Sequence, residues 1–227
     1  MRKVFISMLL MLTAISAMAQ DDLEYRMEIG AGAGLMSYEG DFNGSIVKNM
    51  QPAALLLARY NINPYMGLRL MGSYGKLKGK AADVSGYLPD DPERLYSFDR
   101  NLADLSLTYE YNFWPYGTGR DYRGARRLTP FVFAGIGGTY ADGGSSSVFT
   151  ANVPLGLGVK YKVGDRMNIG AEWAMHFSLS DKLDGVADPR HVASSGLFKN
   201  TDCYSMFLVT VSYSVAAKCR TCHNDNE

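Results

Sequence analysis

The sequence has no long hydrophobic run beyond its first twenty residues, because no later segment approaches the ~18 uninterrupted apolar residues of a membrane-spanning helix. It also has no excess of charge of one sign: 23 Lys and Arg residues balance 23 Asp and Glu residues. That balance excludes the polybasic surface typical of nucleic-acid-binding proteins, so we expect no nucleic-acid partner. Cysteine is scarce, and none directly follows the apolar N-terminal stretch, as a lipoprotein would require.

The N-terminus has the features of a secretory signal peptide. Arg2 and Lys3 precede an apolar stretch at residues 4–16, which is too short to cross a bilayer as a helix. Residues 17–19 (AMA) form a small-x-small cleavage pattern. We therefore expect residues 1–19 to be a signal peptide, residues 20–217 to be one β-barrel, and residues 218–227 to be a periplasmic tail.

Apolar and polar side chains alternate over long stretches, which is the period of a β-strand. Residues 103–113 place Ala, Leu, Leu, Tyr, Tyr and Phe on one face, and Asp, Ser, Thr, Glu and Asn on the other. Several runs exceed the usual globular strand of about 5–6 residues and suit a tilted membrane-spanning strand of ~9–11 residues or more. The pattern predicts strands at 23–39, 51–61, 65–78, 98–113, 130–141, 148–163, 167–180 and 203–217.

A soluble β-sandwich would also alternate, but its apolar face would pack into a core. Here the polar faces are rich in glycine and paired charge, and the apolar faces end in aromatic residues such as Tyr109, Tyr111 and Phe113. Those features are typical of a membrane barrel with its lipid-facing aromatic girdle. The sequence therefore predicts an all-β, eight-stranded antiparallel transmembrane β-barrel in the cell outer membrane, in contact with outer-membrane lipid.

An even number of strands places both termini in the periplasm. The predicted outer loops are then 40–50, 79–97, 142–147 and 181–202, and the tight periplasmic turns are 62–64 and 164–166. The third turn, 114–129, is long and basic. It carries Arg120, Arg123, Arg126 and Arg127.

Eight strands leave an interior that side chains roughly fill. Buried charges persist only when they are paired and hydrogen-bonded, so we expect a balanced ionic network that plugs the barrel and argues against a porin. The predicted network consists of Arg26, Arg59, Arg69 and Lys160 with Glu28, Asp104, Glu110 and Glu172.

The three cysteines allow several interpretations. Residues 219–223 (CRTCH) match the attachment motif of a c-type haem, but no domain surrounds them to bury a haem, so we expect no cofactor. Cys203 and Cys219 lie at opposite ends of one strand, ~50 Å apart at ~3.3 Å per residue, too far for a disulfide. Cys203 is then a free thiol or pairs outside the chain. Cys219 and Cys222 bridge each other or, as we favour, form an intermolecular disulfide with a periplasmic partner.

Other motifs carry little chemistry. His176 and Ser178 share the polar face of one strand and could be half of a hydrolase site, but a hydrogen-bonded lumen histidine is the simpler interpretation. Asp181, Asp184 and Asp188 lack the ligand spacing of an EF-hand and suit a solvated loop. The glycines of residues 135–138 (GIGG) precede no helix, so we attribute them to crowding inside the barrel. We therefore expect no enzyme activity and no metal site.

Three segments carry a resemblance to a known family: residues 37–43 (SYEGDFN), 129–138 (TPFVFAGIGG) and 180–186 (SDKLDGV). The mature chain resembles the Bacteroidota outer-membrane barrel family that includes PorG, a component of the type IX secretion system. The resemblance implies a barrel that anchors the periplasmic ring of the lipoprotein PorK and its partner PorN to the outer membrane. The family offers no catalytic residues to carry over.

The basic turn and the cysteine tail are the only sizeable periplasmic features, so we expect Arg120, Arg123, Arg126, Arg127, Cys219 and Cys222 to contact that ring. Other functions fit the same sequence. A generic structural or adhesive barrel would act through the loops at 79–97 and 181–202. A lipid-modifying barrel enzyme and a soluble periplasmic haem protein are the remaining alternatives.

Overall fold

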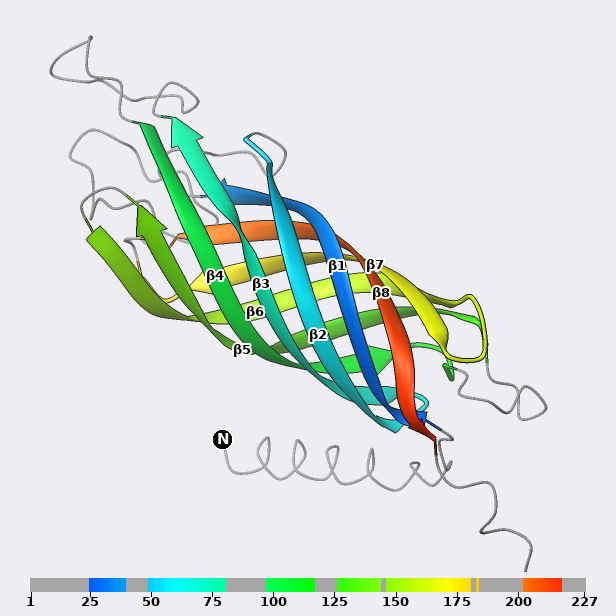
Figure 1. Ribbon diagram of the computed structural model, residues 1–227. Helices are drawn as coiled ribbons and strands as arrows, with labels where there is room; N and C mark the ends of the chain where they lie inside the picture. The colour runs from blue at the N-terminus through cyan, green and yellow to red at the C-terminus, as the bar shows by residue number, and fades with distance from the viewer. Residues whose placement is uncertain are drawn as a thin grey trace, which may run out of the picture.

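The structure, a computed structural model, describes residues 25–39, 49–80, 97–116, 126–143, 146–180, 183 and 202–217. The described chain forms eight long strands, each hydrogen-bonded in antiparallel fashion to its neighbours in sequence, and β1 pairs with β8 to close the barrel (Figure 1). The strands are β1 (Tyr25–Glu39), β2 (Gln51–Asn63), β3 (Met66–Lys80), β4 (Ser97–Asn112), β5 (Leu128–Gly143), β6 (Ser146–Lys162), β7 (Met167–Ser178) and β8 (Cys203–Ala217). The predicted all-β, eight-stranded antiparallel barrel is confirmed.

Two predicted connections are shorter than the sequence suggested. The outer loop expected at 142–147 is wrong for most of its length, because β5 and β6 stay paired up to Gly143 and Ser146. β2 also continues to Asn63, so only residues 64 and 65 form the turn before β3. Polar and glycine residues signalled turns in both places, but ladder hydrogen bonds extend through them because each strand end still has a partner.

The outer wall of the barrel is apolar. Side chains that alternate outward are exposed leucine, isoleucine, valine and aromatic residues, with exposures as high as 69% for Ile136, 70% for Leu56 and 76% for Phe149. A soluble protein rarely exposes a contiguous apolar surface of this kind. The sandwich alternative is therefore wrong, since these faces point away from the interior and not toward a second sheet.

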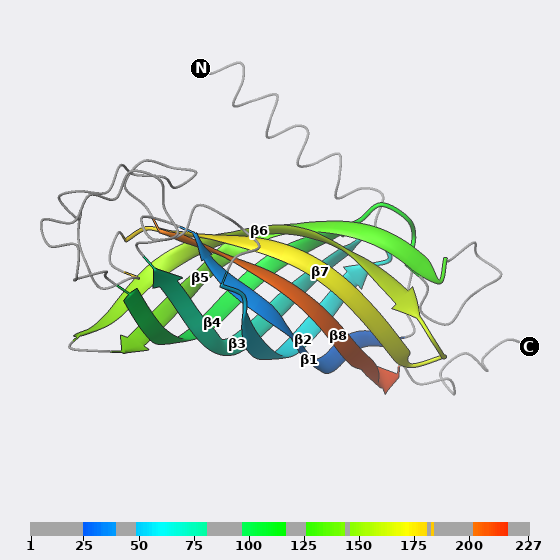
Figure 2. The ribbon, with the colours of Figure 1, turned by 90° about the horizontal axis from the view of Figure 1, so that it is seen from above.

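The barrel has two ends, which can be followed in Figures 1 and 2. The terminal end is where β1 begins and β8 ends, and the loop end is opposite. Tight connections at residues 64–65 and 163–166 lie at the terminal end. No helix among the described residues is long and apolar enough to span a membrane.

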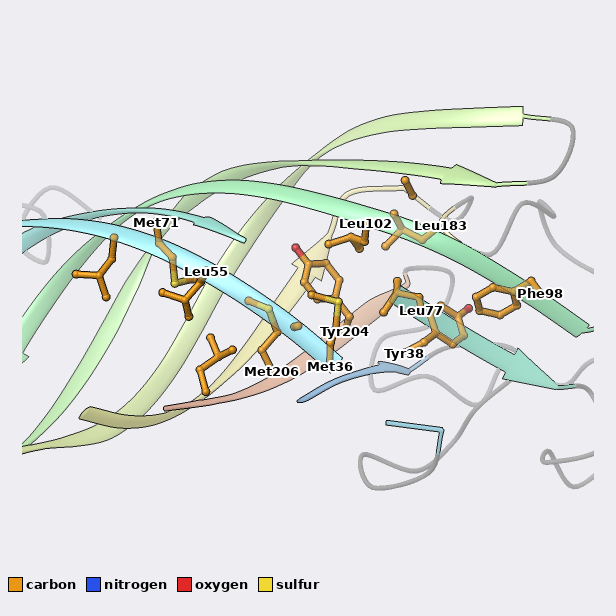
Figure 3. Packing of buried hydrophobic residues seen from close by; sticks show 14 residues of the cluster. Met36, Tyr38, Leu55, Met71, Leu77, Phe98, Leu102, Leu183, Tyr204 and Met206 are labelled. Carbon is orange, nitrogen blue, oxygen red and sulfur yellow. The ribbon is translucent and has the colours of Figure 1, made fainter. Parts of the chain in front are cut away.

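The interior is divided along its length, which the sequence prediction of a polar lumen did not anticipate. Toward the terminal end it is ionic. Toward the loop end buried apolar side chains from β1, β2, β3, β4 and β8 pack against one another (Figure 3). This apolar plug includes Met36, Tyr38, Leu55, Leu77, Phe98, Leu102, Leu183 and Met206.

Candidate functional site

The ionic part of the lumen is centred on Glu110 of β4. Arg59 Nε lies 2.8 Å from Glu110 Oε2, and Arg69 Nε lies 3.1 Å from Glu110 Oε1. Lys160 of β6 forms a third ion pair with the same carboxylate. All four side chains are almost completely buried. One carboxylate thus holds three cations that come from three different strands.

Two further carboxylates balance these cations. Glu28 of β1 pairs with Arg59 at 2.7 Å and accepts hydrogen bonds from Asn61 at 2.8 Å and Ser212 at 3.1 Å. Glu172 of β7 pairs with Arg69. A buried ion pair is tolerated when its remaining lone pairs and protons find partners. Most charged atoms of this cluster have such partners, whereas Arg69 Nη2 and Glu172 Oε1 have none among the described residues.

β5 contributes aromatic rings to the same layer. The guanidinium of Arg69 lies 4.4 Å from the ring centroid of Phe133, and Lys160 Nζ lies 4.3 Å from that of Phe131. The two rings stack with centroids 5.8 Å apart. Cation–π attraction is strongest where the cation is desolvated. The two rings therefore stabilise the buried cations of Arg69 and Lys160.

The eight charges expected to form one network do not all meet. The structure brings together Arg59, Arg69, Lys160, Glu28, Glu110 and Glu172 in the cluster described above. Arg26 is exposed at the start of β1, so its place among the buried charges was wrong. Its parity along the strand is inward, but so near the terminal end the barrel no longer covers it.

Asp104 is buried, but it belongs to a second polar layer nearer the loop end. Its Oδ2 accepts hydrogen bonds from Tyr204 at 2.9 Å and Thr139 at 3.2 Å. Asn152 of β6 also donates to it. Asp104 is therefore held by neutral donors, and its place in the Arg–Glu network was wrong.

His176 lies in this second layer. Its ring stacks on Tyr204 with centroids 4.6 Å apart, and its Nδ1 lies 3.9 Å from Asp104 Oδ1, beyond hydrogen-bond range. His176 is buried in the lumen, as expected, but the expected hydrogen bond is absent, since neither ring nitrogen has a hydrogen-bond partner among the described residues. Ser178 Oγ donates to Ser180 O at 3.1 Å, so it serves the end of its own strand.

At the loop end, one residue of the last predicted outer loop packs into the barrel. Leu183 is fully buried in the apolar plug, and its backbone N–H donates to Asp202 Oδ2 at 2.8 Å. Tyr38 Oη donates to Asp202 Oδ1 at 2.5 Å, and the Tyr38 ring meets Phe98 edge to face (Figure 3). The sequence analysis missed Leu183 and Asp202, because it treated residues 181–202 as a solvated loop. The apolar side chain of Leu183 could have indicated that this residue is buried.

At the terminal end, the predicted partner-binding residues are only partly described. Arg126 and Arg127 are exposed, and the Arg126 guanidinium lies 4.9 Å from the ring centroid of Trp114. Arg120, Arg123, Cys219 and Cys222 lie outside the described residues. Cys203 is a buried thiol at the start of β8.

No group of three metal-ligating side chains occurs within the described ranges. Asp181, Asp184 and Asp188 are outside them. Residues 135–138 lie within β5, where glycine lets neighbouring strands and side chains approach closely.

In a closed barrel every strand is paired on both sides, so the backbone groups are satisfied within a bilayer. A closed barrel with an apolar outer wall is the architecture of outer-membrane proteins. The protein is an outer-membrane β-barrel. Because tight turns face the periplasm in such barrels, the terminal end is expected on that side.

Solved structures with a similar fold include outer-membrane proteins of low sequence identity. The attachment invasion locus protein Ail of Yersinia pestis is 13% identical, with a TM-score of 0.49 over 85% of this chain and 100% of Ail. OprG of Pseudomonas aeruginosa is 13% identical, with a TM-score of 0.46 over 88% of this chain and 100% of OprG. Neisserial surface protein A is 16% identical, with a TM-score of 0.44 over 83% of this chain and 97% of that protein.

No curated protein matches the sequence of this chain. A family described as "Domain of unknown function (DUF6089)" matches residues 2–224, nearly the whole sequence. The chain belongs to the DUF6089 family.

Proposed function

We propose that this barrel is a non-enzymatic structural component of the type IX secretion system that anchors the periplasmic PorK/PorN ring to the outer membrane. The type IX secretion system is proposed because residues 37–43, 129–138 and 180–186 resemble the PorG family. The filled lumen is the structural observation that favours an anchor over a channel.

The lumen supports this role because the described residues fill it at two levels. The ionic cluster joins β1, β2, β3, β4, β6 and β7 near the terminal end, and the apolar plug with Leu183 fills the loop end. A barrel of this kind acts through its surfaces and not through a pore.

We propose no catalytic role for the barrel because His176 and Ser178 do not contact each other. His176 is fully buried, with its ring against Tyr204, and Ser178 Oγ contacts Thr150 Oγ1 at 3.4 Å and not the histidine. A base and a nucleophile must lie within hydrogen-bond reach of each other to act together. This pair is therefore a part of the filled interior.

The terminal end provides the surface for the ring. Arg126 stacks on Trp114, and Arg127 is exposed beside it, with its backbone carbonyl bonded to the N–H of Lys162 at 2.8 Å. These arginines extend from folded strand ends, so they present charge at fixed positions. The tail with Cys219 and Cys222 follows β8, which ends on the same side.

The test is affinity purification of the full-length protein in mild detergent, with and without reductant, followed by detection of PorK and PorN. A variant that changes Arg120, Arg123, Arg126 and Arg127 to Glu should lose ring proteins. A variant with Cys219→Ser and Cys222→Ser should lose any reductant-sensitive link. The matched control changes Lys76, Lys78 and Lys80 to Glu in β3, toward the loop end, and should retain the ring.

Unchanged capture of the ring by both variants would reject these contacts. If wild-type protein captures no ring at all, the secretion role is wrong. The remaining hypothesis is then a generic structural or adhesive barrel that acts through its loops.

A further inference from the structure

The lipid-facing wall has a hollow on one side of the barrel. A pocket of about 470 Å³ opens on the outer surface of β3–β6, beside Leu179. Its rim consists of side chains that alternate outward, and they include Leu70, Leu105, Ile136, Val153 and Leu179. Because each of these side chains is at least 36% exposed, the pocket faces the bilayer and not the lumen.

The hollow exists because its floor lacks large side chains. Gly138 of β5 and Ala151 of β6 are directly opposite partners, and both line the pocket. The ring of Phe149 lies close to Gly138: a Cβ added to Gly138 would be 3.2 Å from Phe149 Cζ. Large residues therefore surround a pair of the smallest ones.

The strand ladder is interrupted beside this floor. The β5–β6 register runs from Leu128 and Tyr161 to Ala134 and Leu155, and it resumes only at Gly137 and Asn152. Pro154 falls in the gap, and proline has no N–H to donate to the ladder. The two strands keep the same register on both sides of this gap.

We propose that this pocket is a specific binding site for one acyl chain of a bilayer lipid. The pocket is continuous with the apolar outer wall that contacts the membrane, so hydrocarbon is the material that meets it. An unfilled space on this scale would leave its lining without contacts on one side, whereas an inserted chain restores them. Leu105, Ile136 and Val153 would hold the chain more firmly than the smooth wall holds its surrounding lipid.

The lipid belongs to the leaflet on the loop-end side. Leu179 follows β7 at the loop end, and its N–H donates to Ala151 O at 2.9 Å, which fixes it at the edge of the pocket. A chain that enters past Leu179 would reach Leu70 nearer the middle of the wall. No charged side chain lines the pocket, so recognition is by the chain and not by a headgroup.

The experiment is native mass spectrometry of the full-length protein, folded in detergent and titrated with phosphatidylglycerol that carries saturated chains. Wild-type protein should retain one lipid more tightly than any other. Ala151→Phe fills the pocket and should weaken that first lipid by roughly tenfold, equivalent to about 1.4 kcal/mol. Ala33→Phe in β1 is the matched control, since Ala33 is also outward-facing and exposed, and it should leave lipid retention unchanged.

A second variant removes the wall of the pocket without filling it. Leu105→Ala should also weaken the first lipid, and folding of every variant is checked by its heat-sensitive mobility on gels. Equal lipid retention by wild type, Ala151→Phe and Leu105→Ala would overturn the proposal. The proposal would also be overturned if the wild-type protein is a dimer and Ala151→Phe abolishes the dimer without changing lipid retention. The pocket would then bind a second copy of the chain.

Discussion

Arg69 and Glu172 form an ion pair that joins opposite walls of the barrel. Arg69 lies in β3 and Glu172 in β7, and three strands separate them in either direction around the closed sheet. Both side chains are buried. Their contact therefore crosses the lumen. Together with the Glu110 cluster, this ion pair fills the interior of the barrel at that level.

Glu110→Gln should destabilise the protein by roughly 3–5 kcal/mol. The substitution removes the one carboxylate shared by Arg59, Arg69 and Lys160, and breaking a buried pair leaves uncompensated buried charge. The free energy of unfolding in urea, measured for protein folded into vesicles, checks this value.

The matched control is Asp99→Asn, which breaks an exposed ion pair. Asp99 Oδ2 lies 3.0 Å from Lys78 Nζ, and their side chains are 52% and 41% exposed. Exposed pairs contribute about 0–1 kcal/mol, so this variant should unfold almost as the wild type does. Equal effects of the two substitutions would contradict the view that the buried cations of this cluster depend on the Glu110 carboxylate.

Gly158→Ala should destabilise the barrel by roughly 1–3 kcal/mol, the usual cost of overpacking a filled interior. A Cβ at Gly158 would lie 2.6 Å from Ala171 O and 2.7 Å from the ring of Phe131. Gly164→Ala is the control, because no atom lies within 4 Å of its added Cβ. Urea unfolding of both variants distinguishes them. A harmless Gly158→Ala would show that the lumen has spare room beside Phe131.

Asp202→Ala should loosen the packing that covers Cys203 at the loop end of the barrel. The substitution removes the acceptor for Tyr38 Oη and for the backbone N–H of Leu183. Cys203, which is buried beside it, then becomes reachable by a water-soluble maleimide. The measurement uses a Cys219→Ser, Cys222→Ser background, so that only Cys203 reports.

The parent of that variant, with Asp202 intact, should label slowly until it is unfolded. If labelling is fast in both proteins, the Asp202 contacts do not protect Cys203. A third protein, Leu183→Ala, separates the apolar side chain from the hydrogen bond, and it should label at an intermediate rate.

The sequence predicted the barrel because the alternation of side chains directly reports which face of a strand meets lipid. Residues 103–113 show this clearly: Leu105 and Leu107 are exposed in the structure, and Ser106 and Glu110 are buried. The same parity identified six charged residues that meet in the lumen. It failed for Arg26, since parity says which way a side chain points but not whether the barrel covers it.

Features that depend on contacts between distant strands could not be read from the pattern. Parity placed Asp104 inside, but only the stagger of the strands decides that it meets Tyr204 and Asn152 and not the arginines. The apolar plug was missed for a related reason. Inward-facing apolar residues such as Leu77 and Leu102 are scattered among polar residues and glycines along their strands, and only the folded barrel brings them together.

Ion conductance of the full-length protein in planar bilayers tests the filled lumen most directly. Insertion is first established by protection of the barrel from protease in vesicles. Inserted wild-type protein should give no steady conductance, because the Arg69–Glu172 level and the Leu183 plug block the lumen at two heights. Large, steady conductance by inserted wild-type protein would contradict the closed interior and the anchoring role built on it.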